Sequence, residues 1–514
     1  MKIVYLPLDE RPCNAIYPQQ LAAMTDLKLT VPNMSILGNK KIPANITQVC
    51  DWLKQESVDT DYLVLSLDML LYGGIVPSRI HELSSDELIN RLNQLVAIKE
   101  QNKNLKIYAF TLIMRTPAYN SNDEEPDYYQ TYGERLFRYG VLLDKKDSGH
   151  LTEAEEKDFV KLKKEIPSEV VKDYTTRRKT NEKANKHALE LVKQGIIDYL
   201  VIPLDDNAEY GFSSIEKRSH IQQVVRDGLL DKVAIYPGAD EVGCTLFAKV
   251  FCEIHQFTPS FFVRYSSTKG PYIIPKCEDR SLGESIKSQI TTAGGKVVDH
   301  SIESDVVLMV HSPAVSQELI AEPVHMLHER HPSYFSEINY QEFIEAIEHY
   351  VGKGKVIGVA DVALCNGSDV VLMNLLSDNR LLDEINAYAG WNTSGNSLGT
   401  VIAHAIIEAF YQNSNQLDVK NKSREFFYAR LIEDWGYQAI VKTEMNKEIV
   451  AQNLGTYFDI SENLTTIEQA IKEKLESFIN RSLLTNKGEI NLIEVYSPWR
   501  RMFEIGIEVS YRKG

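Results

Sequence analysis

Short apolar runs that end in polar or acidic residues are the feature that most limits what this chain can fold into. Each run is apolar at successive positions rather than at alternate ones. Strands that are apolar on both faces are typical of parallel sheets covered by helices on each side. The runs are Lys2–Leu8, Tyr62–Leu67, Lys106–Met114, Tyr199–Leu204, Lys232–Tyr236, Phe261–Tyr265, Asp305–Val310 and Lys355–Ala360.

Helical segments lie between these runs, for example Asp86–Glu100 and Ile215–Leu230. The alternation predicts an α/β fold, either a closed barrel or a doubly wound open sheet. Acidic residues follow many successive runs, whereas an open sheet concentrates its site at one switch point. We therefore expect a (β/α)8 TIM-type barrel.

The predicted domain organisation is a barrel with additions. The barrel covers residues 1–410, with a charged helical insertion at about 144–190 and a small α/β lobe at about 258–300. The charge run of the insertion indicates a solvated helix face. From 411 to 514 the pattern becomes mainly helical and ends in a hairpin signal near Tyr496–Ser510, which predicts a C-terminal accessory region.

Composition narrows the class of partner. The chain has 56 Lys and Arg against 72 Asp and Glu, a formal net charge of −16. Such a chain repels nucleic acids and anionic membranes, so a neutral or cationic small molecule is the expected ligand. No stretch approaches the roughly 20 apolar residues of a membrane span.

The N-terminus and the cysteines predict a cytoplasmic location. The apolar run in MKIVYLPLDERP is too short for a secretory signal. The six cysteines form no CxxC pair, and HExxH does not occur, so the sequence predicts no metal and no cofactor. Assembly into a homo-oligomer is left open.

Two pairs of acids follow neighbouring strand runs. Asp205 and Asp206 follow YLVIPL, and Asp240 and Glu241 follow KVAIY after a Pro-Gly-Ala turn. Two close carboxylates push one pKa up, so that one acid stays protonated while the other stays charged. We regard all four as candidate catalytic residues. The alternative is that they cap helices or form loop ion pairs, since Asp is common in such loops.

Three further charged residues follow the first two runs. Asp9 and Arg11 come after the first run, and Asp68 ends the second, before Gly73 and Gly74. Carboxylates and guanidinium groups bind sugar hydroxyls through charge-assisted hydrogen bonds. These residues are candidates for substrate binding. An Asp–Arg ion pair that closes the rim is an equal alternative for any one of them.

The segment YAGWNTSGNSLG leads into an apolar helix signal. Its two glycines have the spacing of a phosphate-binding loop, but Asn396 and Ser397 stand where Lys and Ser/Thr would be needed. We therefore reject a nucleotide site. Trp391 is a candidate for stacking on a sugar, and Asn392 and Asn396 for binding its hydroxyls. A buried tryptophan over a capped helix N-terminus explains the segment equally well.

The motifs LPLDERPCN, SLDMLLYGGIVPSR, PLDDNAEYG, YPGADEVG and YAGWNTSGNSLG occur in this order. Together they resemble a bacterial family catalogued only as a domain of unknown function. The resemblance covers most of residues 1–410, and it implies no activity.

A more distant resemblance is local. The strand-end Asp-Asp pair is similar to that of O-GlcNAcase-type β-N-acetylhexosaminidases, which implies a (β/α)8 barrel. It also implies that Asp205 orients the 2-acetamido group and that Asp206 is the general acid and base. GADEV resembles the GGDEV motif of the other large hexosaminidase family, which would give Asp240 and Glu241 these two roles. We prefer the first pair, with Asp240 and Glu241 as substrate-binding groups or an alternate acid.

The leading hypothesis is therefore a glycosidase. We expect an exo-acting β-N-acetylhexosaminidase for GlcNAc or GalNAc, with substrate-assisted retention, acting on short intracellular oligosaccharides. One alternative is a Mg²⁺- or Mn²⁺-dependent hydrolase or phosphotransferase, whose metal ligands would come from the strand-end acids. Another is a non-catalytic sugar-binding protein. The acids of the metal alternative are Asp9, Asp68, Asp205, Asp206 and Asp240.

Overall fold

The computed structural model describes residues 1–414, 416–483, 485 and 488–513. The chain divides into two compact units, which are described separately below. Unit 1 comprises residues 1–10, 27–243 and 277–279, and unit 2 comprises 11–26, 244–276 and 280–514. Residues 411–514 were expected to form an accessory region. They belong to unit 2, which also contains a five-stranded parallel sheet.

Unit 1 is built on a six-stranded parallel sheet with the order β2-β1-β3-β4-β5-β6. Each of the five long strands is apolar on both faces in the sequence, and most of their residues are buried. The strands are β1 (Lys2–Leu6), β2 (Lys28–Thr30), β3 (Tyr62–Ser66), β4 (Lys106–Phe110), β5 (Tyr199–Leu204) and β6 (Val233–Pro237).

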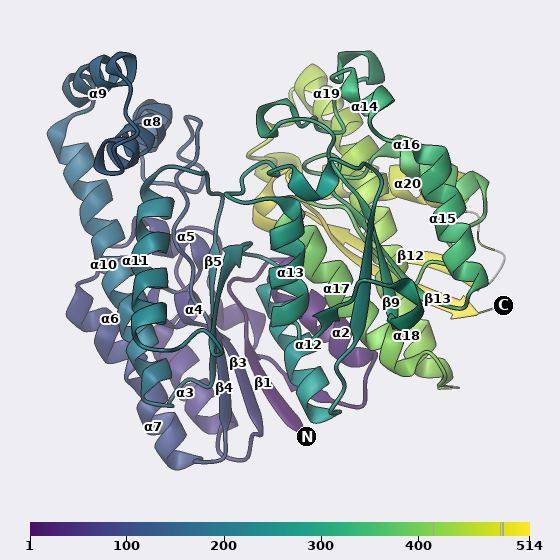
Figure 1. Ribbon diagram of the computed structural model, residues 1–514, viewed down its shortest axis with the longest axis horizontal. Coiled ribbons are helices and arrows are strands. Elements are labelled where there is room, and N and C mark those ends of the chain that lie inside the picture. The colour runs from purple at the N-terminus through teal and green to yellow at the C-terminus, as the bar shows by residue number, and fades with distance from the viewer. Residues whose placement is uncertain (415, 484, 486–487, 514) are drawn as a thin grey trace. The chain divides into compact units, whose positions relative to one another are not determined.

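Helices cover this sheet, and one buried apolar cluster joins them to the strands. The segment predicted as a charged insertion, about 144–190, comprises the end of α8, all of α9 and most of the long α10. Helices α8 and α9 pack together, and all three helices lie between β4 and β5 in the chain (Figure 1). The helices of unit 1 are α3 (Ile46–Glu56), α4 (Leu67–Tyr72), α5 (Ile75–Ile80), α6 (Ser85–Leu92), α7 (Gln94–Gln101), α8 (Tyr129–Asp147), α9 (Glu153–Glu165), α10 (Ser168–Lys193) and α11 (Phe212–Arg226).

Unit 2 holds a five-stranded parallel sheet with the order β11-β10-β9-β7-β8. The predicted small lobe at 258–300 supplies β7, α13 and β8, the first strand–helix–strand unit of this sheet. The predicted hairpin near the C-terminus is the antiparallel pair β12 and β13. The strands are β7 (Ser260–Tyr265), β8 (Lys296–Val297), β9 (Val306–His311), β10 (Val356–Asp361), β11 (Ala387–Ala389), β12 (Gly488–Tyr496) and β13 (Gly506–Lys513).

Several helices of unit 2 and the hairpin share one apolar cluster with β9 and β10. This cluster includes the π-helix η6 (Leu431–Val441), which continues α18. The helices are α1 (Pro12–Ala15), α2 (Tyr17–Ala23), α12 (Val242–Ile254), α13 (Leu282–Thr292), α14 (Ser333–Ser336), α15 (Tyr340–Gly352), α16 (Val370–Asp378), α17 (Ser394–Tyr411), α18 (Leu417–Arg430), α19 (Lys442–Gln452) and α20 (Leu464–Ser482).

The α/β class with parallel strands is confirmed, but the described strands do not close into the expected eight-stranded barrel. A barrel needs strands that follow one another in a single direction around a ring. Here β1 lies between β2 and β3, and β7 lies between β8 and β9, so the winding reverses once in each sheet. The reversal leaves edge strands, and each sheet has the doubly wound order 2-1-3-4-5, extended in unit 1 by a sixth strand.

Within the part of the chain that the structure describes, no helix is both long and apolar enough to cross a membrane.

Candidate functional site

The candidate site of unit 1 lies at the carboxyl ends of its parallel strands. In a doubly wound sheet, ligands bind at this edge, near the point where the strand order reverses. For unit 1 that point is between β1 and β3, which are followed by Asp9 and Asp68. Asp205 and Asp206 follow β5 at the same edge.

Asp68 is fixed by the local structure that follows β3. Ser66 caps α4, its Oγ accepting the Met69 N–H at 3.1 Å, so Asp68 falls in the first turn of the helix. Its carboxyl accepts the Leu112 N–H at 2.9 Å. Burial, together with the nearby charge of Asp205, raises the pKa of Asp68 to about 7.

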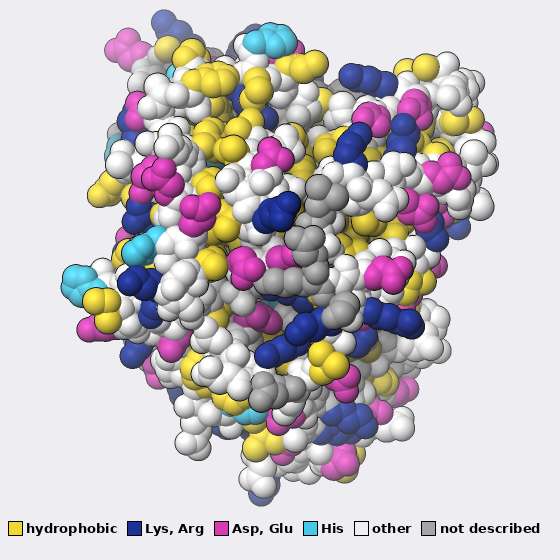
Figure 2. Space-filling view, turned by 90° about the vertical axis from the view of Figure 1, so that its right-hand side faces the viewer, with side chains coloured by type: hydrophobic (Ala, Val, Ile, Leu, Met, Phe, Trp, Pro, Cys, Tyr) yellow, Lys and Arg dark blue, Asp and Glu magenta, His cyan; other side chains and the backbone are white. Residues whose placement is uncertain are grey.

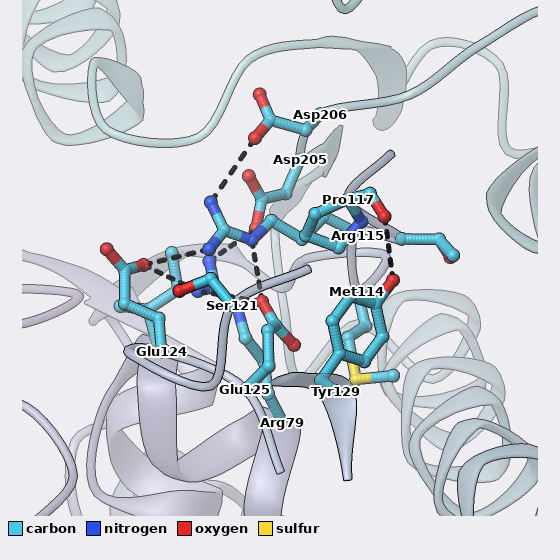
Figure 3. A network of polar contacts seen from close by, with 12 residues as sticks. Arg79, Met114, Arg115, Pro117, Ser121, Glu124, Glu125, Tyr129, Asp205 and Asp206 are labelled. Atoms are coloured by element: carbon cyan, nitrogen blue, oxygen red, sulfur yellow. Dashed lines mark hydrogen bonds and ion pairs between the residues drawn. The ribbon is translucent and has the colours of Figure 1, made fainter. Parts of the chain in front are cut away.

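Two arginines, the buried Arg79 and the partly exposed Arg115, hold the Asp205–Asp206 pair (Figure 3). Arg79, on α5, is 2% exposed, and its Nη2 lies 2.7 Å from Asp205 Oδ2. Arg115, in the loop after β4, places Nη1 3.2 Å from Asp206 Oδ2. Each acid of the pair therefore has a guanidinium group of its own.

Glu124 and Glu125 join these two arginines to one another (Figure 3). Glu124 Oε2 lies 2.8 Å from Arg79 Nη1 and 3.1 Å from Arg115 Nη2. Glu125 Oε1 lies 2.8 Å from Arg115 Nε and 3.5 Å from Arg79 Nη1. Because two guanidinium groups face four carboxyl groups, the network carries an excess of acid that favours a bound proton.

Asp206 is the more accessible member of its pair. The Asp206 side chain is 29% exposed, whereas that of Asp205 is 10% exposed. Burial, and next the charge of Asp205, raise the pKa of Asp206 to about 6. Its backbone has φ +25°, a conformation that costs energy for a residue other than glycine. Such strain at a charged strand end is a common property of functional sites.

Asp240 and Glu241 follow β6 in the same unit. Glu241 is fully buried, and its Oε2 accepts the Ala239 N–H at 2.9 Å. Gly238 has φ +152°, and a Cβ added there would stand 2.0 Å from Glu241 Oε1. Glu241 therefore packs directly beneath its own loop.

Four of the predicted binding residues belong to unit 2, namely Arg11, Trp391, Asn392 and Asn396, whereas Asp9 is buried in unit 1. Arg11 is buried, with its guanidinium 4.6 Å from the Trp499 ring centre and 3.8 Å from Glu504. Trp391 is also buried; its ring meets Tyr17 edge-on, and its Nε1 donates to Thr400 Oγ1 at 3.3 Å.

Asn392 and Asn396 flank the start of α17. Asn392 has φ +51°, and its carbonyl oxygen accepts the Asn366 N–H at 2.8 Å. Asn396 is buried in the first turn of the helix, where its carbonyl accepts the Thr400 hydroxyl. The structure thus brings Asp68, Asp205 and Asp206 together in unit 1, whereas Arg11 and the Trp391 segment lie in the other unit.

Sequence reasoning missed a second polar cluster at the carboxyl edge of the sheet in unit 2. His311, the last residue of β9, places Nδ1 3.1 Å from Ser266 Oγ and Nε2 3.0 Å from Asp369 Oδ2. Arg330 Nη1 and the Tyr340 hydroxyl also contact Asp369, at 3.0 and 2.6 Å. A histidine directly after an apolar strand run was the available signal.

The acids of this second cluster have opposite pKa shifts. Burial raises the pKa of Asp361 to about 6, partly offset by His311. Burial also opposes ionisation of Asp369, but His311 and Arg330 outweigh it and hold the pKa of Asp369 well below its usual range. Both acids are almost fully buried, so the cluster forms a closed polar network.

No group of three or more His, Cys, Asp or Glu side chains among the described residues is arranged to hold a metal ion. Asp205 and Asp206 contact guanidinium groups. This arrangement can hold one carboxylate fixed and exchange a proton at the other.

A family model described as "Protein of unknown function (DUF4127)" matches residues 3–508 of the chain. No curated protein matches it.

Proposed function

The chain belongs to the DUF4127 family of proteins of unknown function, and we propose that it is a glycoside hydrolase acting on N-acetylated β-hexosaminides. The observation that carries this proposal is the different surroundings of two adjacent acids. Asp205 is held by Arg79 at 2.7 Å, whereas Asp206 is more exposed and has a pKa raised to about 6. A fixed carboxylate beside an acid that is partly protonated near neutral pH suits glycosidic bond cleavage.

In this proposal Asp206 transfers the proton and Asp205 orients the substrate. Asp206 protonates the leaving oxygen while Asp205 holds the 2-acetamido group, whose carbonyl oxygen attacks the anomeric carbon. Asp206, now a carboxylate, then takes a proton from the attacking water, and the sugar leaves with retained configuration. Short oligosaccharides of GlcNAc or GalNAc inside the cell are the proposed substrates.

The proposal draws on the paired acids and not on a shared fold. The hexosaminidases that the Asp-Asp pair resembles use a closed barrel, whereas the described strands here form open sheets. Glu241 contacts its own loop at Ala239, which supports a role in shaping that loop and favours Asp205 and Asp206 as the reacting pair.

The first test is hydrolysis of nitrophenyl β-N-acetylhexosaminides by the whole chain. We expect Asp206→Asn to lower kcat by about 100-fold or more, because the amide cannot take the proton of the attacking water. Glu209→Gln, an exposed change in the same loop, is the matched control and should retain activity. Absence of wild-type hydrolysis of both GlcNAc and GalNAc substrates would contradict the proposal.

The pH profile provides a second test. Because the pKa of Asp206 is raised to about 6, the acid is protonated below that value and loses its proton above it. We expect kcat/KM to fall about tenfold per unit above this pKa when proton donation limits the rate. A profile without a basic limb between pH 5 and 8 would remove Asp206 from the role of acid.

A further inference from the structure

Asn207, the residue after Asp206, is buried with its amide group unpaired. Asn207 is 7% exposed, and its backbone N–H donates to the Cys277 carbonyl at 3.0 Å. Neither Oδ1 nor Nδ2 has a hydrogen-bond partner among the described residues. Burying an amide in this way is costly unless something meets its hydrogen bonds.

Asn207 and Asp206 both line the same small cavity. The space open to the centre of a water molecule is about 10 Å³, which is about the room that one water needs. The cavity is lined by Thr116, Phe137, Asp206, Asn207, Ala208, Tyr210, Gly211, Phe212, Ser213 and Ser214.

The hydroxyl groups of the cavity wall already have protein partners. Ser213 Oγ donates to the Met114 carbonyl at 3.1 Å, and Ser214 Oγ donates to the Ala208 carbonyl at 2.6 Å. Thr116 Oγ1 accepts from the Tyr174 hydroxyl and from Arg178. The polar groups best placed to hold a ligand here are therefore the Asn207 amide and the Asp206 carboxyl.

We propose that this cavity holds one water molecule between Asn207 and Asp206, and that Asp206 draws its attacking water from it. Only the second part of this proposal, the use of the water in catalysis, rests on the proposed function. A water both donates and accepts, so it can accept from Asn207 Nδ2 or donate to Oδ1 while it also contacts the carboxyl group.

The water reacts in the second step of the proposed hydrolysis. After the leaving group has departed, the Asp206 carboxylate takes a proton from the water. The water oxygen forms a bond to the anomeric carbon, and the bond from that carbon to the acetamide oxygen breaks, returning its electron pair to the acetamide. Asp206 ends protonated, as it began.

The water site is tested without any activity measurement. A crystal structure that resolves ordered water should show one water within hydrogen-bond distance of Asn207 and Asp206. Asn207→Leu should leave the melting temperature unchanged or lower, because the hydrogen bonds of the water are lost with the amide. A dry cavity, or a higher melting temperature for Asn207→Leu as expected for removal of an unsatisfied amide, would overturn the proposal.

Asn185 is the matched control for stability. It is a buried asparagine of the same unit, but its Oδ1 accepts from the Thr111 hydroxyl and its Nδ2 donates to the Leu112 carbonyl. Asn185→Leu should lower the melting temperature because it leaves both partners unpaired. This variant calibrates what loss of a satisfied amide costs in this protein.

The catalytic role of the water is tested with an aryl glycoside whose leaving group needs no protonation. We expect Asn207→Leu to keep the initial burst of released phenol and to lower the steady-state rate about tenfold, since only the second step uses the water. The control is Ser219→Ala on α11. The Ser219 hydroxyl donates to Glu182 of α10 and does not line the cavity, so this variant should behave as wild type.

A variant with an unchanged steady-state rate would overturn the role of the water. If the wild type hydrolyses no glycoside, the proposed function fails, while the water site is still decided by the crystal structure and the melting temperatures.

Discussion

At the scale of single residues, the candidate site is defined by the arginines as much as by the acids. Arg79 binds Asp205 across 126 positions of sequence, and Arg115 binds Asp206 across 91. Because the two acids have similar intrinsic pKa values, only their surroundings can give them different roles. Burial and the charge of Asp205 raise the pKa of Asp206 to about 6, and a guanidinium group fixes each member of the pair.

Asp68 offers a test of the electrostatics through stability. Burial raises its pKa to about 7, so between about pH 4 and 7 the folded state binds a proton that the unfolded state has lost. Stability from this group is therefore lost as the pH rises through that window. We expect Asp68→Asn, whose amide oxygen still accepts the Leu112 N–H, to be more stable than wild type at about pH 8, by about 2 kcal/mol.

The measurement is urea unfolding at acid and at alkaline pH. Asp59→Asn is the control with the opposite sign, because a hydrogen bond from Lys2 lowers the pKa of Asp59 on the surface. An Asp68→Asn variant that is less stable than wild type at alkaline pH would show that the Asp68 charge is stabilised in the folded state.

At the scale of elements, the sharp end of α4 depends on Gly73. This residue has φ +86°, and its N–H donates to the Met69 carbonyl at 3.1 Å. A Cβ added there would stand 2.5 Å from the Ala44 backbone nitrogen. The turn at Gly73 and Gly74 separates α4, which carries Asp68, from α5, which carries Arg79, so it positions both residues of the site.

We expect Gly73→Ala to destabilise the protein by about 3 kcal/mol, since it combines a left-handed backbone with a clash. Gly195, which follows α10, has φ +73° but nothing within 4 Å of an added Cβ. Gly195→Ala should therefore cost only about 1 kcal/mol, the price of the backbone conformation alone. The measurement is thermal unfolding. If the two variants lose the same amount of stability, a small backbone shift relieves the contact with Ala44.

The strands were the most predictable elements. Run Tyr199–Leu204 matches β5 at both ends, and run Tyr62–Leu67 differs from β3 by one residue. The short strands β2, β8 and β11 have two or three residues each and too little periodicity to give boundaries from sequence. All three are edge strands, and β2 and β8 are the strands that give their sheets the reversed order.

At the scale of the whole molecule, charge limits the partners. The chain carries a formal net charge of −16, and Figure 2 shows acidic side chains interspersed with basic ones over the face that it presents. A molecule with this net negative charge is expected to release few counterions on binding a polyanion. We therefore expect no saturable binding of duplex DNA at about 0.15 M salt up to about 10 µM protein, measured by fluorescence anisotropy. Binding that weakens steeply with added salt would reveal a basic surface.

The sequence by itself determined the class of fold and the edge where the acids lie. Runs that are apolar at successive positions predict buried parallel strands, and residues after such strands share the carboxyl edge of a sheet. Both are local properties, since the apolar run and the residues that follow it are adjacent in the sequence. Asp68, Asp205 and Asp206 were found in this way.

Only the tertiary structure decided which strands are neighbours and which charges meet. Acids after successive strands fit a barrel as well as an open sheet, and the reversal at β1 and β7 depends on which strand edges pair across long stretches of chain. The same holds for the contacts of Arg79, Arg115, Glu124 and Glu125. The periodicity of the sequence does not predict such pairings, because they form when segments far apart in the chain pack against one another.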